Sequence, residues 1–216
     1  MTPRIKICCI SSIEEANMAI HHGASALGLV GSMPSGPGII SDELIFSIAQ
    51  QVPTTIETFL LTSETSAEKI IIHHRKVKTS TIQMVDALQK GTYLQIKKAL
   101  PGIKLVQVIH VVDEHSIDEA IEISEQVDYL LLDSGNPNLK TKILGGTGMV
   151  HNWNISRKIV AQSKVPVYLA GGINAENVKE ALDKVQPYGL DLCSSVRTNN
   201  KLDKIKLAAF FKIALY

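Results

Sequence analysis

Two patterns of hydrophobic and polar residues alternate along the whole chain. Short apolar runs, typical of buried strands, are followed by segments in which apolar residues recur every third or fourth position, typical of amphipathic helices. The predicted strands are residues 4–9, 25–30, 55–61, 81–85, 103–112, 129–133, 165–169 and 189–193. The predicted helices lie at residues 12–22, 41–51, 65–75, 116–126, 153–163 and 201–214, with one more ending near residue 100 and another starting after residue 174.

This order of elements predicts a (β/α)8 barrel, or TIM barrel, of the α/β class. Eight strand–helix pairs in 216 residues match that fold, and right-handed crossovers close the parallel strands into a barrel. A doubly wound open sheet is the alternative, but it would gather the site residues at one switch point. The candidate residues follow the first, sixth, seventh and eighth strands instead. No repeat or linker divides the chain, so we expect a single domain over residues 1–216.

The composition excludes several classes of protein. Hydrophobic residues make up 45% and charged residues 20% of the chain, as in ordinary globular proteins. The formal net charge of +1 gives no electrostatic signal for nucleic-acid binding. No apolar run approaches the roughly 18 residues needed to cross a bilayer, and the N-terminus lacks a signal-peptide pattern. We therefore expect neither a nucleic acid nor a membrane as a partner. The chain has three cysteines and no disulfide framework, which indicates a protein of the reducing cytoplasm.

One stretch of the chain predicts a phosphate-binding turn. An apolar run ends at Gly171 and Gly172, and Asn174 is expected to cap the helix that follows. Such a turn directs backbone N–H groups and the positive end of a helix dipole toward one point, which favours an anion such as phosphate. Alone, this is equally well an ordinary strand-to-helix turn. Two more loops of small residues, at 145–148 and 193–195, strengthen the prediction of one phosphate cradle.

The first strand places a lysine and a cysteine on the same face. With a period of two, Ile5, Ile7 and Cys9 face the helix layer, while Lys6 and Cys8 point into the barrel mouth. A buried lysine is costly unless it is paired, so we expect an acidic partner or an anionic ligand for it. A nearby ammonium also favours the thiolate form of a cysteine. The alternative interpretation of Cys8 is a small buried apolar residue.

Asp133 directly follows three leucines at the end of the sixth strand. Barrels keep their catalytic groups at this end of the strands. Partial burial there raises the pKa of a carboxyl and lets it act as an acid near neutral pH. A carboxylate that caps the next loop is the alternative. The seven histidines show no metal-ligand spacing, so we interpret them as surface or capping residues and expect no metal.

Six motifs occur in the order of a known enzyme family. They are Lys6-Ile-Cys8, the strand from Gly23 to Val30, Leu131-Leu-Asp133, Gly145 to Gly148 with Trp153 behind it, Leu169 to Gly172 with Asn177-Val178, and Asp191 to Ser194. Over nearly its whole length the chain resembles the phosphoribosylanthranilate isomerase family of tryptophan biosynthesis, whose members are (β/α)8 barrels. The resemblance implies an Amadori rearrangement of a small phosphosugar substrate, an aldose-to-ketose isomerisation without a cofactor. It also implies a monomer or a homodimer.

The resemblance assigns a role to each candidate residue. Asp133 is the expected general acid, which protonates the furanose ring oxygen, and Cys8 is the expected general base, which takes the C2 proton from the resulting Schiff base. Lys6 and Gln83 are the expected substrate-binding residues. The phosphate is expected on backbone N–H groups, across the barrel from Cys8. The residues around it are Gly146, Gly148, Gly171, Gly172 and Ser194.

Three motifs depart from the family pattern. After the second strand the family has Ser-Pro-Arg, whose arginine binds the anthranilate carboxylate, whereas this chain has Gly-Pro-Gly ending at Gly38. The fourth strand normally ends Gln-Leu-His-Gly but here reads Gln-Met-Val-Asp at residues 83–86. The last motif, usually Ser-Ser-Gly-Val-Glu, reads Cys-Ser-Ser-Val-Arg at residues 193–197. Either Arg197 or Lys6 could compensate for the missing arginine.

These departures leave other functions open. The barrel could act on a different sugar phosphate that lacks a carboxylate, or it could bind such a ligand without catalysis. A pentose-phosphate epimerase or a thiamin-phosphate synthase would share the phosphate cradle. The epimerase would need metal-binding histidines on its strands, and the sequence shows none. The isomerase remains the preferred interpretation.

Overall fold

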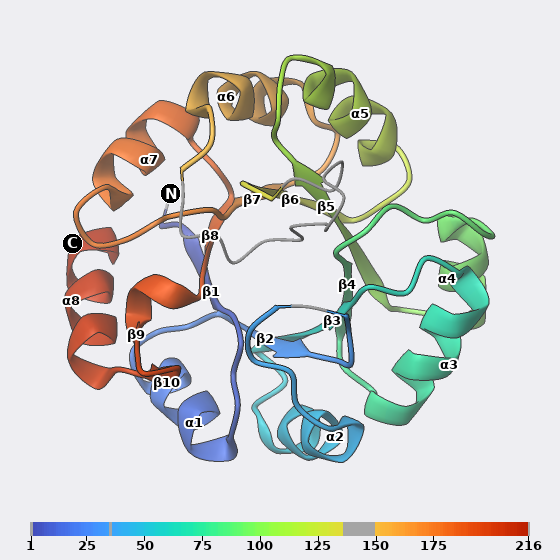
Figure 1. The fold of residues 1–216 in the computed structure, drawn as a ribbon, viewed down its shortest axis with the longest axis horizontal. Coiled ribbons are helices and arrows are strands. Elements are labelled where there is room, and N and C mark those ends of the chain that lie inside the picture. The colour runs from blue at the N-terminus through green and yellow to red at the C-terminus, as the bar shows by residue number, and fades with distance from the viewer. Residues whose placement is uncertain (1, 35, 136–149, 216) are drawn as a thin grey trace.

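Eight parallel strands close into one barrel, with helices packed around its outside (Figure 1). This computed structural model describes residues 2–34, 36–135 and 150–215. Each strand pairs with the next along the chain, and β1 pairs with β8 to complete the ring. The predicted (β/α)8 barrel is therefore confirmed, and the open doubly wound sheet is excluded.

The strands and helices lie close to their predicted positions. The barrel strands are Arg4–Ile7 (β1), Ala26–Val30 (β2), Glu57–Thr62 (β3), Thr81–Met84 (β4), Lys104–His110 (β5), Tyr129–Asp133 (β6), Val167–Leu169 (β7) and Gly189–Leu192 (β8). The helices are Ile13–His21 (α1), Asp42–Gln51 (α2), Ala67–Val77 (α3), Tyr93–Ala99 (α4), His115–Ser124 (α5), Trp153–Gln162 (α6), Val178–Val185 (α7) and Lys204–Leu215 (α8). None of the helices in the described part of the chain is long and apolar enough to span a membrane.

Side chains of the strands alternate between two packed layers, as a period of two requires. Ile5, Leu27 and Leu60 belong to the layer between the barrel and the helices. Phe59 and Leu131 belong to the second layer, which fills the barrel interior. The interior is thus a packed core. A site can therefore form only at one of the two mouths of the barrel.

The start of α7 differs from its prediction. Asn174 does not cap the helix, because α7 begins at Val178 with Asn177 as its N-cap residue. The Asn174 side chain instead accepts hydrogen bonds from the backbone N–H groups of Glu176 and Asn177, at 2.9 and 3.1 Å. A separate turn therefore stands between the two glycines and the helix.

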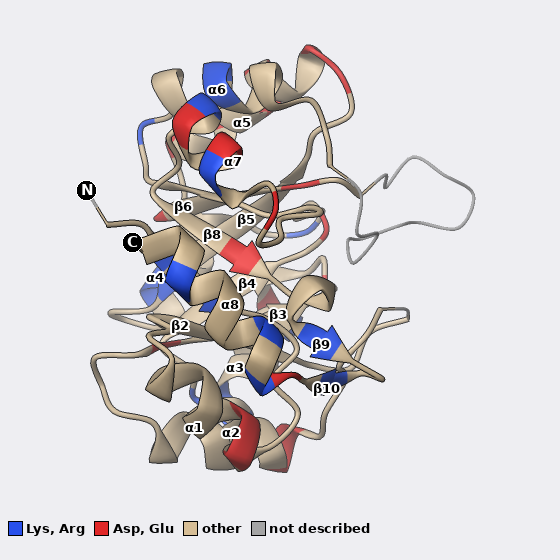
Figure 2. Ribbon diagram, turned by 90° about the vertical axis from the view of Figure 1, so that its left-hand side faces the viewer, with Lys and Arg blue, Asp and Glu red and all other residues tan. Residues whose placement is uncertain are grey.

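A short hairpin after β8 was not predicted. The chain forms a 3-10 turn at Ser194–Val196 (η1) and two short antiparallel strands, Arg197–Thr198 (β9) and Lys201–Leu202 (β10). They lie at the end of the barrel opposite the N-terminus (Figure 2). The helix predicted from residue 201 consequently starts at Lys204, where the Asp203 carboxylate accepts the N–H groups of Ile205 and Lys206.

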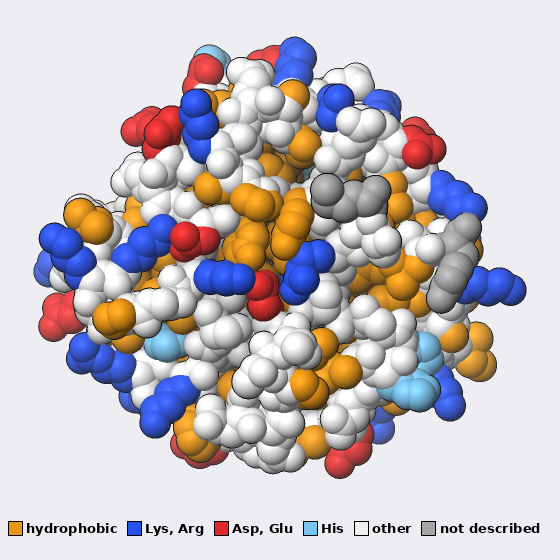
Figure 3. Space-filling view, turned by 180° about the vertical axis from the view of Figure 1, so that it is seen from behind, with side chains coloured by type: hydrophobic (Ala, Val, Ile, Leu, Met, Phe, Trp, Pro, Cys, Tyr) orange, Lys and Arg blue, Asp and Glu red, His pale blue; other side chains and the backbone are white. Residues whose placement is uncertain are grey.

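The other mouth of the barrel, where the strands begin, is closed by aromatic and charged side chains. Hydrophobic side chains occupy the middle of this face, beside basic and acidic ones (Figure 3). Tyr168 packs edge-on against Tyr129 and Tyr188, with ring centroids 5.7 and 5.5 Å apart. Lys104 bridges Glu57 and the Tyr129 hydroxyl. This end of a barrel serves stability, so we expect the site at the opposite end, where the strands finish.

Candidate active site

The buried lysine has the acidic partner that was predicted. Lys6 is fully buried, and its Nζ lies 2.9 Å from Oδ1 of Asp191 on the neighbouring strand β8. Its ammonium also stands 5.2 Å from the centroid of the Phe59 ring. Burial alone would lower the pKa of Lys6, but the charge of Asp191, its hydrogen bond and the neighbouring cysteines together outweigh burial and raise that pKa. The lysine is therefore a fixed positive charge inside the barrel.

Cys8 and Lys6 meet over a glycine of the next strand. A Cβ atom added to Gly28 would lie 2.9 Å from the Cys8 sulfur and 3.0 Å from the Lys6 Nζ. The glycine thus leaves the space in which the thiol and the ammonium come together. This arrangement confirms that both side chains point into the barrel, with the charge near the sulfur.

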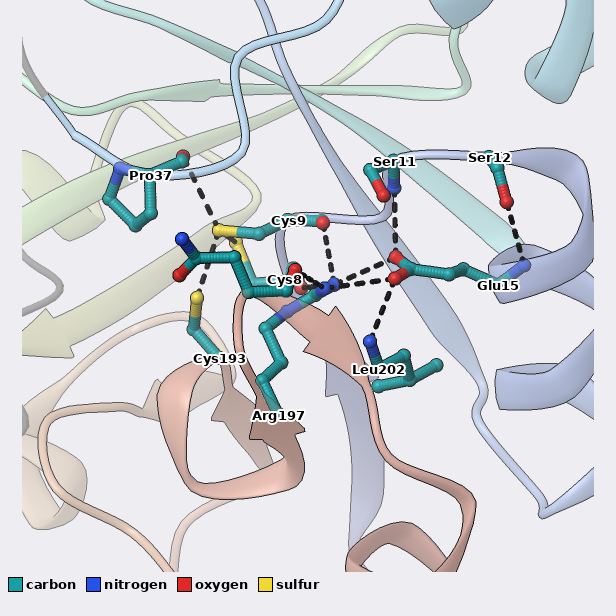
Figure 4. Close-up of polar contacts among 10 residues, drawn as sticks. Cys8, Cys9, Ser11, Ser12, Glu15, Pro37, Cys193, Arg197 and Leu202 are labelled. Atoms are coloured by element: carbon teal, nitrogen blue, oxygen red, sulfur yellow. Dashed lines mark hydrogen bonds and ion pairs between the residues drawn. The ribbon is translucent and has the colours of Figure 1, made fainter.

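Cys9 does not face the helix layer, contrary to the prediction. Strand β1 ends at Ile7, and Cys9 adopts a left-handed backbone with φ of 62°. This conformation breaks the alternation and turns the side chain back toward the barrel mouth (Figure 4). Its sulfur lies 3.8 Å from that of Cys8 and 3.6 Å from the carbonyl oxygen of Pro37.

Asp133 stands at the C-terminal end of β6, as predicted. Its carboxylate accepts a hydrogen bond of 2.7 Å from the backbone N–H of Ser134. Burial raises the pKa of Asp133, and this effect exceeds the opposing influence of that hydrogen bond and of Lys6. A raised pKa favours the protonated carboxyl, which is the form that a general acid requires.

His110 is a functional candidate that the sequence analysis missed. It was interpreted as a surface or capping residue, but it is buried at the end of β5, in register with Asp133 of β6. Its Nε2 lies 3.1 Å from the carbonyl oxygen of Val85, and its Nδ1 has no hydrogen-bond partner among the described residues. The available signal was its position at the end of the strand preceding that of Asp133.

Gln83 also points into the barrel. It is buried on β4, and its side-chain oxygen has no hydrogen-bond partner in the part of the chain that the structure describes. A buried carbonyl oxygen without a donor is costly, so it is suited to accept a hydrogen bond from a bound molecule. The structure therefore leaves Gln83 available for the substrate-binding role predicted for it.

Two of the predicted phosphate-binding residues line one cavity. Gly172 and Ser194 border a space of about 410 Å³ between the turn after β7, η1 and α8. Ser195 of η1 and Lys206 of α8 are among the other residues that line this cavity. The strand before Ser194 is β8, which pairs directly with β1. The prediction that this part of the cradle lies across the barrel from Cys8 is therefore wrong.

Gly171, in the same turn after β7 as Gly172, packs against Ser134. Its φ is +76°, and a Cβ atom there would lie 3.0 Å from the Ser134 hydroxyl oxygen. Both the left-handed backbone and the close approach require glycine. Gly146 and Gly148, the remaining predicted phosphate-binding residues, lie outside the described residues.

Arg197 does not replace the missing arginine. Its guanidinium forms a two-pronged ion pair with Glu15, with N···O distances of 3.1 and 3.0 Å. It also donates hydrogen bonds to the carbonyl oxygens of Cys8 and Cys9 (Figure 4). All of these contacts are internal, so Arg197 braces the end of β1 and is not available for a substrate carboxylate.

The absence of the arginine is linked to the presence of Cys9. Gly38 has a φ of +77°, and a Cβ atom there would lie 2.5 Å from the Cβ of Cys9. No side chain fits at position 38 while Cys9 keeps its place.

We therefore expect Gly38→Ala to lower the free energy of unfolding by about 2–5 kcal/mol, from overpacking and a left-handed backbone together. In a Cys9→Gly background the contact with the Cys9 Cβ disappears and only that with its Cα, at 3.0 Å, remains, so the cost should fall to about 1–2 kcal/mol, mostly the part due to the backbone. Urea denaturation of the four proteins of this double-mutant cycle measures the coupling. Equal costs in the two backgrounds would contradict the link.

Comparisons with known proteins agree with this geometry. The family model of N-(5'-phosphoribosyl)anthranilate isomerase matches residues 5–213. N-(5'-phosphoribosyl)anthranilate isomerase 2 of Methanosarcina mazei is 35% identical over 96% of this chain and 92% of its own. The isomerase of Methanocella arvoryzae is 28% identical over 96% of this chain and 95% of its own.

Solved structures show the same fold. Phosphoribosyl anthranilate isomerase from Thermotoga maritima superposes with a TM-score of 0.82 at 26% identity, and the match covers 98% of each chain. A phosphoribosyl anthranilate isomerase solved with reduced 1-(o-carboxyphenylamino)-1-deoxyribulose 5-phosphate has a TM-score of 0.79 at 24% identity, again over 98% of each chain. From the family match over nearly its full length, this chain belongs to the N-(5'-phosphoribosyl)anthranilate isomerase family.

Proposed function

We propose that the chain converts N-(5'-phosphoribosyl)anthranilate into its 1-deoxyribulose 5-phosphate derivative, the aldose-to-ketose step of tryptophan biosynthesis. One observation carries the proposal. A thiol beside a fixed ammonium and a carboxyl with a raised pKa stand at the same mouth of the barrel, on Cys8 and Asp133. We further propose that residues 1–216 act as one domain, as a monomer or a homodimer. Three free thiols suit the cytoplasm as the place of the reaction.

Asp133 begins the reaction as the general acid. Its protonated carboxyl gives a proton to the furanose ring oxygen, the C1–O bond breaks, and the open chain becomes a protonated Schiff base with the anthranilate nitrogen. Burial favours the protonated carboxyl before this step, because it raises the pKa of Asp133. The fixed charge of Lys6 then stabilises the carboxylate that remains, because it acts in an interior of low dielectric.

Cys8 completes the reaction as the general base. Its thiolate takes the proton from C2 of the Schiff base, and the electron pair moves toward the nitrogen to form an enol–amine. This product tautomerises to the ketose. One proton is given by Asp133 and one is taken by Cys8, so the substrate is isomerised without net gain or loss of protons. The Lys6 ammonium lies beside this sulfur, because both approach the same point over Gly28.

The substrate phosphate anchors the sugar for both steps. We place it on backbone N–H groups of the loops after β6, β7 and β8, with Gly171, Gly172 and Ser194 contributing alongside Gly146 and Gly148. The cavity that Gly172 and Ser194 share supports this placement. Gln83, with its buried unpaired oxygen, supports a contact to a donor group of the substrate. In this arrangement Lys6 acts mainly through its charge, because Asp191 occupies its ammonium.

Genetic complementation tests the function in a cell. A bacterial strain that lacks this isomerase and needs tryptophan should grow without it once the chain is expressed. A chain carrying Cys8→Ala, expressed to the same level, should not restore growth. Failure of the unchanged chain, present in folded form, would contradict the proposed function.

The raised pKa of Asp133 predicts a stabilising but inactivating substitution. Because that pKa is raised in the folded protein, the carboxyl favours folding at low pH, and this contribution is lost as pH rises through the folded-state pKa. Asparagine does not titrate and keeps the oxygen that accepts the Ser134 N–H. Asp133→Asn should therefore have a higher melting temperature than the unchanged protein at neutral pH, and the difference should shrink at acidic pH. A difference that grows toward acidic pH would contradict the burial effect.

A further inference from the structure

Three free thiols gather between the end of β1 and the start of η1. The sulfur of Cys9 lies 2.9 Å from that of Cys193 and 3.8 Å from that of Cys8 (Figure 4). A disulfide bond is about 2.0 Å long, so the first pair needs to approach by only about 1 Å to be joined. The proposed mechanism uses Cys8 alone and leaves this pair without a role.

The fold itself brings the pair together. Strands β1 and β8 close the barrel, with Ile7 in register with Leu192, so the cysteines that follow leave the barrel side by side. The left-handed backbone of Cys9 then aims its side chain at Cys193. Arg197 holds the Cys9 carbonyl oxygen and so fixes this backbone.

The two thiols of the pair are not equivalent. Cys193 is half-buried, whereas Cys9 is only 5% exposed, so an oxidant in solution meets Cys193 first. Contact with the Cys9 thiol and the charge of Arg197 lower the pKa of Cys193. The contacts with Cys193 and Cys8 raise the pKa of Cys9. Cys193 is therefore suited to attack as a thiolate, and Cys9 to resolve the product as a neighbouring thiol.

We propose that Cys9 and Cys193 form a site of reversible oxidation by hydroperoxides, and that their disulfide slows turnover. The Cys193 sulfur attacks hydrogen peroxide, the O–O bond breaks, and a sulfenic acid and one water form. The Cys9 sulfur then attacks the Cys193 sulfur, the S–O bond breaks, and the hydroxide leaves with the Cys9 proton as a second water. Two thiols are oxidised to one disulfide while one peroxide is reduced to two waters.

The effect on turnover rests on the proposed function. The cross-link would join the residue after Cys8, the proposed base, to the residue before Ser194, in the proposed phosphate cradle. Arg197 donates to the carbonyl oxygens of both Cys8 and Cys9, so a shift of one is passed to the other. A displacement of about 1 Å at a catalytic group can cost about a hundredfold in rate.

Peptide mapping after peroxide treatment tests the site without any assay of activity. The full-length protein is exposed to hydrogen peroxide, its remaining thiols are alkylated, and it is digested with trypsin without reductant. Cys8 and Cys9 fall in one tryptic peptide and Cys193 in another, so variants must identify the linked sulfur. The cross-linked peptide should persist in Cys8→Ser and disappear in Cys9→Ser and Cys193→Ser. A cross-link that survives Cys9→Ser, or none in the unchanged protein, would overturn the proposal.

Turnover measured on the same samples tests the consequence. Peroxide should lower turnover of the unchanged protein by about tenfold to a hundredfold, and dithiothreitol should restore it. Cys193→Ser is the matched control, because it introduces the residue that the family usually has there. After peroxide treatment, the turnover of Cys193→Ser should show no loss that dithiothreitol can restore. If the chain does not turn the substrate over at all, the cross-link still forms, so failure of the proposed function is distinguished from failure of the oxidation site.

Discussion

Replacing Cys8 by alanine is expected to lower kcat by about 10²–10⁴-fold, the range that a positioned general base contributes. The substitution removes the sulfur that stands beside Lys6 and facing Gly28. It adds no volume and leaves the Lys6–Asp191 ion pair in place. Steady-state kinetics with N-(5'-phosphoribosyl)anthranilate measures the loss.

Binding and stability provide the controls for this substitution. The affinity for reduced 1-(o-carboxyphenylamino)-1-deoxyribulose 5-phosphate, the ligand solved with a related barrel, should change little, because that molecule needs no proton transfer. The midpoint of urea denaturation should also stay close to that of the unchanged protein. Turnover that survives in Cys8→Ala would refute its role as the base, and Cys9 would then be the next thiol to test.

Replacing Lys6 by methionine is expected to cost about 3–5 kcal/mol of folding free energy, as for other buried ion pairs that lose one partner. The methionine fills the space but leaves the Asp191 carboxylate without its ammonium, at 9% side-chain exposure. The same change removes the positive charge that lies beside the Cys8 sulfur, so kcat should fall as well. Urea denaturation and steady-state kinetics measure the two losses separately.

A double variant separates the structural from the chemical role of Lys6. Lys6→Met combined with Asp191→Leu replaces the ion pair by apolar side chains, which often recovers the stability that a single change loses. We expect the double variant to regain most of the folding free energy while its kcat remains low. Recovery of turnover together with stability would show that the pair serves the fold alone.

The overall fold followed from the sequence because its signals are local and repeated. The helix–strand units carry their own periodicity, and some carry end signals, such as Ser12 and Ser41, whose side chains cap α1 and α2. The acidic partner expected for Lys6 also followed, because an isolated ammonium inside a barrel is too costly to leave unpaired. Which acidic residue pairs with Lys6 follows only from the pairing of β1 with β8, which brings Asp191 beside it.

The features that were missed depend on how distant segments meet. Cys9 turns inward because its backbone is left-handed, and no pattern of hydrophobic residues encodes that angle. Arg197 forms an ion pair with Glu15. The two residues lie far apart in the sequence, so the sequence around Arg197 does not reveal this internal contact. His110 shares the mouth with Asp133 through the register of β5 and β6. Which residues of two neighbouring strands lie side by side depends on how the strands pair, and this is known only from the structure.

We expect the thiol of Cys8 and the carboxyl of Asp133 to isomerise a phosphosugar held at the barrel mouth. The most direct test is turnover of freshly generated N-(5'-phosphoribosyl)anthranilate, followed by the loss of its fluorescence. We predict turnover by the unchanged protein and its abolition by either Cys8→Ala or Asp133→Asn, both folded. A folded, unchanged protein that binds ribose phosphates but leaves the fluorescence constant would contradict the claim.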